Sequence, residues 1–428
     1  MKRVTISKKL MLWIGVACSL ALVLTLCACA PKQNPGNPTP TAEKAEVTPA
    51  ADQFGVVHAE SWKDIYPNQY DSYMKNLENN EEGKADFLAD DQQPEIKTIG
   101  KGYGYAKYYT EPLSHLYSLE TVGNNGRVSE KTLANCITCK SPQFSAEVQQ
   151  KGDVMFTANF RETLAQYDEP ISCYNCHEND PTQLVVTQPN WIRAMGDDAD
   201  KAPMSAQVCG QCHNDYYFDP VTKVTSNPYN GIASMNPDDS LAWYNRIDFA
   251  DWTYESTGAK MIAVRHAEFE YVFGSGGSHM ANLGYSCNNC HMAPTTASDG
   301  SAYSDHNWIS PLDNPELIER DCSKCHSDIT AEVKAWQEEL DGQTHQVGLR
   351  AERFIHNFED AINNNSINDE QKTRLQTIQR EACFYWNFVS AENSEGAHNP
   401  TLTRDTLAKA TNLLDEADAI LGVSSKQA

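Results

Sequence analysis

The last third of the chain carries the clearest alternation of apolar and polar positions. In residues 331–365, 369–392 and 405–422, apolar side chains recur at steps of three and four residues, which is the period of an amphipathic helix. Good helix formers such as Ala, Leu, Glu and Gln dominate these stretches. The pattern predicts three long helices, beginning near residue 330.

The start of the chain has a different pattern. A basic start leads into an apolar run shorter than the roughly 18 residues that a membrane-spanning helix needs. This is typical of an export signal over residues 1–28, and "LCACA" resembles a bacterial lipobox with lipid attached to Cys29. An uncleaved anchor is the alternative. The Pro-, Thr- and Ala-rich residues 29–52 predict an extended tether, and residues 53–428 one folded body. We expect the protein to be exported, periplasmic or on the outer face of the cytoplasmic membrane.

The formal net charge of −24 changes the range of possible partners. It argues against binding to nucleic acid, whose backbone calls for a basic surface. It also means that an anionic substrate would need a local positive region to reach a site. Most of the acidity fits the ordinary requirement that an exported protein stay soluble.

The cysteines form the strongest motif. Ten of the fourteen fall into five Cys-x-x-Cys pairs, and a histidine directly follows four of them. Disulfides, zinc sites and redox thiols also use cysteine pairs, but none of these explains the histidine. Cys-x-x-Cys-His is the attachment motif of a c-type haem, in which the histidine ligates the iron. The five motifs are Cys136, Cys139 and Lys140; Cys173, Cys176 and His177; Cys209, Cys212 and His213; Cys287, Cys290 and His291; and Cys322, Cys325 and His326.

Further histidines are needed if the haem irons have two histidine ligands each. Eight remain outside the motifs, which is enough: His58, His115, His266, His279, His306, His345, His356 and His398. Five haems would themselves form much of the core, so we expect weak hydrophobic patterning upstream of the C-terminal helices.

The first motif ends in Lys140 instead of histidine. A lysine can ligate iron only as the neutral amine, and its free side chain keeps the proton until about pH 10.4. A desolvated pocket and a nearby metal both favour loss of that proton. An iron held by Lys140 with no side chain opposite would be open to a substrate. The alternative is a degraded haem site kept as a thiol pair or disulfide.

This set of motifs, with the lysine motif first, resembles the pentahaem cytochrome c nitrite reductases of the ammonia-forming type, from roughly residue 60 to residue 410. The resemblance implies a mainly α fold built around five covalently bound haems, with long C-terminal helices that pack between the subunits of a homodimer. It implies a six-electron reduction of nitrite to ammonium at the Lys140 haem, with four bis-histidine haems relaying electrons from a membrane quinol-oxidising cytochrome c. The rival function is an electron-transfer cytochrome without a substrate site.

The resemblance also assigns the residues around the substrate. "RHAEFE" identifies His266, "CGQCHNDYYF" identifies Tyr216, and "LYSLETVGNNGR" places Arg127 at the family's arginine offset. Arg127 and His266 would hydrogen-bond the oxygens of nitrite, and His266 would donate protons. Tyr216 would be a polar neighbour or relay.

The distal iron ligands follow from the same resemblance. His115 is expected opposite the third motif, His306 opposite the second, His398 opposite the fourth and His279 opposite the fifth.

One departure from the family concerns calcium. Members that bind calcium beside the active haem carry a lysine and a glutamine where this chain has Ala263 and Arg265. A small site would not hold both a cation and a guanidinium. We therefore expect no calcium, with the Arg265 side chain in its position and paired with Asp215, as in a calcium-independent branch of the family.

Overall fold

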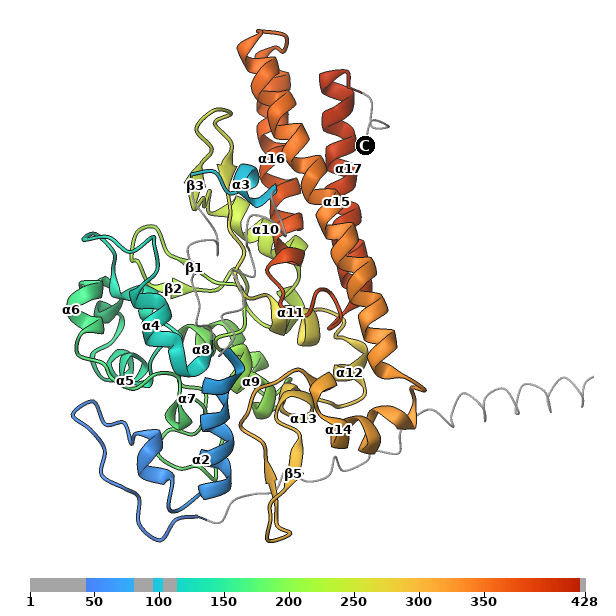
Figure 1. Cartoon of the computed structure of the whole chain (residues 1–428). Helices are drawn as coiled ribbons and strands as arrows, with labels where there is room; N and C mark the ends of the chain where they lie inside the picture. The colour runs from blue at the N-terminus through green and yellow to red at the C-terminus, as the bar shows by residue number, and fades with distance from the viewer. Residues whose placement is uncertain (1–43, 81–94, 103–113, 424–428) are drawn as a thin grey trace, which may run out of the picture. The chain divides into compact units, whose positions relative to one another are not determined.

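Three long helices at the C-terminal end dominate the structure, a computed structural model that describes residues 44–80, 95–102 and 114–423. They are α15 (Ile329–Asn363), α16 (Asp369–Ser390) and α17 (Pro400–Leu421), and they pack against one another (Figure 1). The side chains of Asp328, Asn368 and Asn399 cap their N-termini, which satisfies backbone N–H groups that lack a helical partner. The prediction of a mainly helical chain with long C-terminal helices is confirmed.

The described residues before α15 form short helices and very little sheet. The helices are α2 (Pro67–Met74), α3 (Glu95–Ile99), α4 (Ser118–Gly123), α5 (Pro142–Lys151), α6 (Phe160–Leu164), α7 (Cys173–His177), α8 (Pro189–Met195), α9 (Met204–Gly210), α10 (Pro237–Arg246), α11 (Glu268–Phe273), α12 (His279–Asn282), α13 (Cys287–His291) and α14 (Pro315–Arg320). The strands pair as three antiparallel hairpins: β1 (Tyr217–Phe218) with β2 (Thr225–Ser226), β3 (Trp252–Thr253) with β4 (Lys260–Met261), and β5 (Pro294–Thr296) with β6 (Ala302–Ser304).

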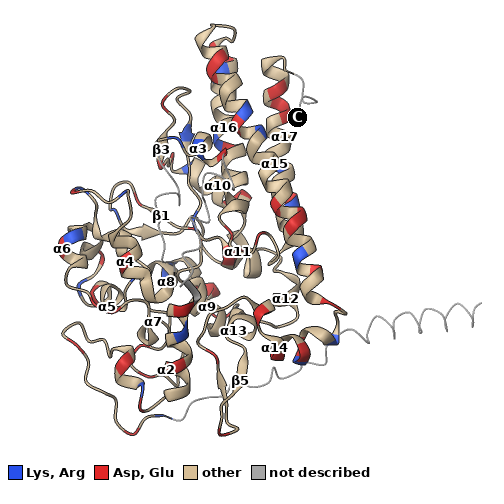
Figure 2. Ribbon diagram, in the orientation of Figure 1, with Lys and Arg blue, Asp and Glu red and all other residues tan. Residues whose placement is uncertain are grey.

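The apolar core consists of one large cluster among the C-terminal helices and several smaller clusters in the rest of the described chain. The largest cluster lies among α15, α16 and α17 and includes Phe354, Phe358 and Trp386. Smaller clusters surround the cysteine motifs, for example Phe144 and Phe156 near the first motif. Acidic residues are spread over many elements, among them α2, α14, α15 and α17 (Figure 2). Among the described helices none is long and apolar enough to cross a membrane. Cys29 and the predicted export signal lie outside the described residues, so these assignments stay predictions.

Candidate haem and substrate site

Two of the Cys-x-x-Cys-His motifs fold as complete short helices. In α7 and α13, the backbone N–H of the N-cap serine donates to the side-chain oxygen of the asparagine three residues later, at 3.0 Å and 2.8 Å, which helps to fix the first turn. Both cysteines and the histidine of each motif therefore lie on one helical turn. All ten motif thiols are free, as covalent attachment to a cofactor requires.

The lysine motif has a different backbone. A 3-10 turn, Ala134–Ile137, ends before Thr138, and Cys139 takes a φ of 63°, which is uncommon outside glycine. Lys140 follows, and Ser141 then caps α5. The Lys140 carbonyl accepts a hydrogen bond of 2.7 Å from the Ser118 hydroxyl of α4. Lys140 therefore lies between the 3-10 turn and α5, and it does not share a helical turn with the two cysteines as His177 and His291 do.

The two rings of each of three predicted ligand pairs lie at nearly the same distance from one another. The ring centroids are 6.0 Å apart for His115 and His213, 6.4 Å for His177 and His306, and 6.0 Å for His291 and His398. A metal bound to imidazole nitrogens at about 2.0–2.1 Å separates two ring centroids by roughly 6 Å. The residues therefore fit an iron between each pair.

The other ring nitrogen of most of these histidines faces a hydrogen-bond acceptor. Nδ1 lies 2.6 Å from the Gln183 carbonyl for His177, 3.0 Å from the Ile309 carbonyl for His291, 2.9 Å from the Ser304 carbonyl for His306, and 2.5 Å from the Glu392 carboxylate for His398. An Nδ1–H donor held in this way leaves Nε2 free as the metal ligand. The arrangement is the one that a bound iron needs.

Burial keeps several of these rings neutral. It lowers the pKa of His115 to about 3 and the pKa values of His291 and His306 to about 4, because a desolvated imidazolium is unfavourable. Only the neutral ring can ligate iron, so the environment favours the ligand form.

The fourth predicted ligand pair, His326 and His279, does not show the ring separation of the other three. Within the described part of the chain, the rings of His326 and His279 make no ring contact. His326 Nδ1 lies 2.7 Å from Glu332, and His279 is exposed at the start of α12. The fifth motif begins in a 3-10 turn, Cys322–Lys324, and Cys325 and His326 follow that turn. Ligation of its haem by His279 stays a prediction.

Positive charge gathers at the first motif in spite of the acidic chain. Burial raises the pKa of the Cys136 thiol, and the charges of Arg127, Arg265 and Lys140 act on it in the opposite direction. Arg127 itself is exposed, and its backbone N–H donates to the Asn125 side chain, which shapes the turn after α4. Lys140 would lose its charge as an iron ligand, so Arg127 and Arg265 are the charges that remain to attract an anionic substrate.

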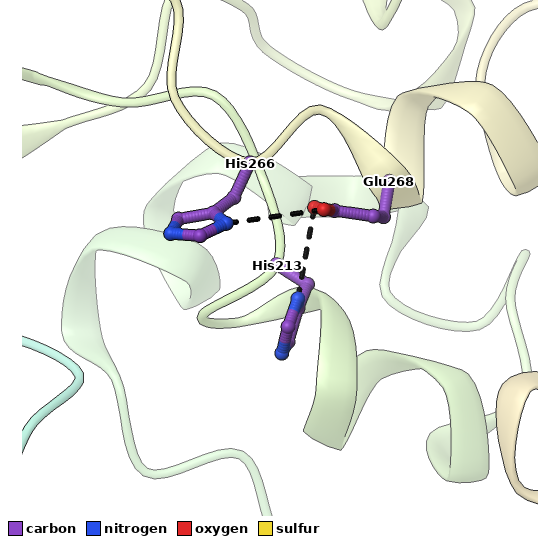
Figure 3. A group of neighbouring side chains, drawn as sticks. All are labelled: His213, His266 and Glu268. Carbon is purple, nitrogen blue, oxygen red and sulfur yellow. Dashed lines mark ion pairs between the residues drawn. The ribbon is translucent and has the colours of Figure 1, made fainter. Parts of the chain in front are cut away.

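His266 shares a buried carboxylate with His213, as Figure 3 shows. Glu268, at the start of α11, has Oε1 3.8 Å from His266 Nδ1 and Oε2 3.6 Å from His213 Nδ1. Burial raises the pKa of Glu268, but the two neighbouring histidines outweigh burial and hold that pKa well below its usual range. Our sequence reasoning missed Glu268, although its place two residues after His266 in "RHAEFE" was the available signal.

Arg265 reaches a different carboxylate from the one predicted. Its guanidinium pairs with Asp251 at 2.6 and 3.2 Å and donates to the Ala263 carbonyl at 2.6 Å. The carbon of the guanidinium lies 5.4 Å from the ring centroid of Tyr216, a cation–π distance. The β3–β4 hairpin explains the difference, because its register brings Asp251 beside Ala263, whose N–H donates to Asp251.

Asp215 is held by other groups. It accepts the backbone N–H of Arg265 at 3.0 Å and the Tyr244 hydroxyl at 3.0 Å. Burial raises the pKa of Asp215 to about 7, and the Arg265 charge opposes that rise. The predicted partners are neighbours, but Asp215 meets the backbone of Arg265, and the ion pair of the side chain is with Asp251.

The fold and the paired histidines define a multihaem c-type cytochrome. Comparisons with known proteins agree: the profile of the cytochrome c552 family matches residues 58–428. The chain is 29% identical over 407 residues to the cytochrome c nitrite reductase subunit NrfA of Nitratidesulfovibrio vulgaris, covering 83% of this chain and 77% of that protein. The solved cytochrome c nitrite reductase of Desulfovibrio desulfuricans, described with two calcium sites, superimposes with a TM-score of 0.73 at 25% identity over 87% of each chain. This chain belongs to the cytochrome c552 family and is an oxidoreductase.

Proposed function

We propose that this protein reduces nitrite to ammonium at the lysine motif. The observation that carries the proposal is that the charges of Arg127 and Arg265 act at the first motif of a chain with a net charge of −24. An electron carrier does not need a positive region at one haem motif, whereas a protein that binds a small anion does. The nitrite reductases among the relatives support the same substrate.

The cofactors would be five c-type haems, one for each cysteine pair. When bound, the haem at the first motif would supply the iron that receives nitrite and the electrons that reduce it. The motif and distal histidines would hold the other four, as the three ring pairs separated by 6.0–6.4 Å support.

The chain's own residues would handle charge and protons. Arg127 and His266 would donate hydrogen bonds to the nitrite oxygens and stabilise negative charge as the N–O bonds break. Reduction to ammonium by six electrons consumes eight protons, so a donor must be reloaded repeatedly. His266 suits this role because an imidazole can exchange protons near neutral pH, and the Glu268 carboxylate lies 3.8 Å from its Nδ1. Tyr216 would be the polar neighbour.

Calcium would be unnecessary beside this site. The Arg265 guanidinium lies among the Ala263 carbonyl, Asp251 and the ring of Tyr216, and it would supply the positive charge that calcium supplies elsewhere. Metal analysis of the purified protein tests this idea, and one tightly held calcium ion per chain would contradict it.

The proposed location and oligomeric state rest on the sequence. An export signal, lipid on Cys29 and a tether would keep the enzyme outside the cytoplasm near a quinol-oxidising cytochrome c, and α15, α16 and α17 would pack between the subunits of a homodimer. Mass spectrometry of the mature N-terminus and light scattering of the purified protein test the anchor and the dimer.

Turnover distinguishes the reductase from its rival, a multihaem electron carrier. The holoprotein, supplied with a reduced viologen and nitrite, should form ammonium in proportion to the nitrite consumed. A protein that is reduced by the viologen but forms no ammonium would be an electron carrier.

A further inference from the structure

A second group of ligand-type side chains includes Asp52 and His58, near the start of the described residues, and lies apart from the haem motifs. His58 Nε2 is 3.1 Å from Asp52 Oδ2 and 3.7 Å from Asp168 Oδ1. One ligand atom from each of the three residues lies within 4.8 Å of the others. Our sequence reasoning left His58 without a role. The structure places its Nε2 between two carboxylates.

A buried amide holds both carboxylates in place. The side-chain NH2 of Gln143 donates to Asp52 and to Asp168, at 2.7 Å in each case. Its carbonyl accepts the backbone N–H groups of Asp168 and Glu169, at 2.9 and 3.1 Å. These contacts fix which end of the amide faces the carboxylates, so the two acids are positioned by α5 as well as by their own segments.

The other ring nitrogen of His58, Nδ1, faces a third carboxylate. Oε2 of the buried Glu169 lies 3.5 Å from His58 Nδ1, and Oε1 accepts the backbone N–H of Ala59 at 2.7 Å. A carboxylate behind a histidine is the usual second layer of a metal site, because it selects the tautomer that leaves Nε2 free.

We propose that His58, Asp52 and Asp168 bind a divalent first-row transition ion, for which Zn²⁺ is the probe. One imidazole with two carboxylates suits Zn²⁺ and its neighbours better than calcium or magnesium, which prefer oxygen ligands alone. Asp168 has 75% of its side chain exposed, which leaves room for water ligands. The ion would join the first described segment of the chain to the loop that leads into α7, the helix of the second haem motif.

The competing explanation is an imidazolium paired with three acids and no metal. Equilibrium dialysis of the holoprotein against Zn²⁺ separates the two, because attached haems occupy the other cysteines and ligand histidines. We expect one zinc ion per chain. Glu169→Gln, which removes only the carboxylate behind the ring, should weaken binding by about 10- to 100-fold. Asp168→Asn, an exposed position that folding tolerates, should weaken binding further and should remove any rise in melting temperature that zinc gives the parent protein.

His356→Gln is the matched control. This exposed imidazole also has two acidic neighbours, but they lie at different ring nitrogens: Glu352 is 3.9 Å from Nε2 and Glu359 is 3.3 Å from Nδ1. The two carboxylates therefore do not converge on one ring nitrogen, as Asp52 and Asp168 do at His58. Its zinc binding should equal that of the parent protein. Unchanged haem absorption would show that each variant is folded. A parent protein that binds no zinc, or that binds it equally well after Asp168→Asn, would overturn the proposal.

Discussion

Because we propose that Arg265 takes the place of calcium, replacing Arg265 with glutamine should make the stability of the protein depend on calcium. The side chains of Arg265 and Asp251 are 13% and 7% exposed, and Asp215 is fully buried beside them. Arg265→Gln removes the guanidinium and leaves Asp251 as an uncompensated buried charge. Breaking a buried pair from one side costs about 3–5 kcal/mol of unfolding free energy.

Calcium should restore much of that loss. The Ala263 carbonyl, the two carboxylates and the new amide oxygen are all hard oxygen ligands of the kind that calcium binds. At a free calcium concentration 100 times the dissociation constant, calcium binding adds about 2.7 kcal/mol to the free energy of unfolding. Urea unfolding of the holoprotein, followed by tryptophan fluorescence with EGTA or with calcium, measures both quantities.

Arg374→Gln is the control for this experiment. The same substitution there breaks a pair with Glu416 in which the two side chains are 39% and 44% exposed, and exposed pairs contribute about 0–1 kcal/mol. That variant should be near parental stability and indifferent to calcium. The reasoning would fail if Arg265→Gln were as stable as the parent in EGTA, or if calcium did not stabilise it.

Three further changes test other parts of the structure. His266→Asn should lower kcat for nitrite by about 100- to 10,000-fold with unchanged haem absorption, measured as ammonium formed. Burial and the charge of Asp215 raise the pKa of Glu270 to about 8, against about 4.3 in an unfolded chain. The folded state therefore binds the extra proton, and its stability falls as pH rises from about 4 to about 8. Urea unfolding across pH should show a smaller fall in Glu270→Gln, because the part caused by the raised pKa of Asp215 remains. A Cβ on Gly348 would lie 2.7 Å from the Glu95 side chain, so Gly348→Ala should lower the free energy of unfolding by about 1–3 kcal/mol. A Cβ on Gly342 of the same helix would meet nothing within 4 Å, so Gly342→Ala should raise the free energy of unfolding by up to about 1 kcal/mol in the same assay.

The fold class could be predicted from the sequence because its signals are local. The helical period in the last third of the chain is visible without tertiary information, and α15 begins at Ile329, close to the predicted residue 330. The cysteine motifs are equally local, since a Cys-x-x-Cys-His run places thiols and imidazole on one turn, as in α7 and α13.

The parts of the site that the sequence did not reveal depend on contacts between distant segments. Asp251 reaches Arg265 only through the β3–β4 hairpin, and periodicity says nothing about the register of two-residue strands. His58 meets Asp168 across 110 positions of sequence. Glu268 was overlooked because its role depends on burial between two histidines, and a sequence motif does not show burial.

The central claim is an open, lysine-ligated haem that binds nitrite, and electron paramagnetic resonance of the oxidised holoprotein during a nitrite titration tests it most directly. We predict that the signal of one haem changes as nitrite is added while the bis-histidine haems keep theirs, and that reduction of the same sample by a viologen yields ammonium. Haem signals that are all unaffected by nitrite, with no ammonium formed, would contradict the account and leave an electron carrier.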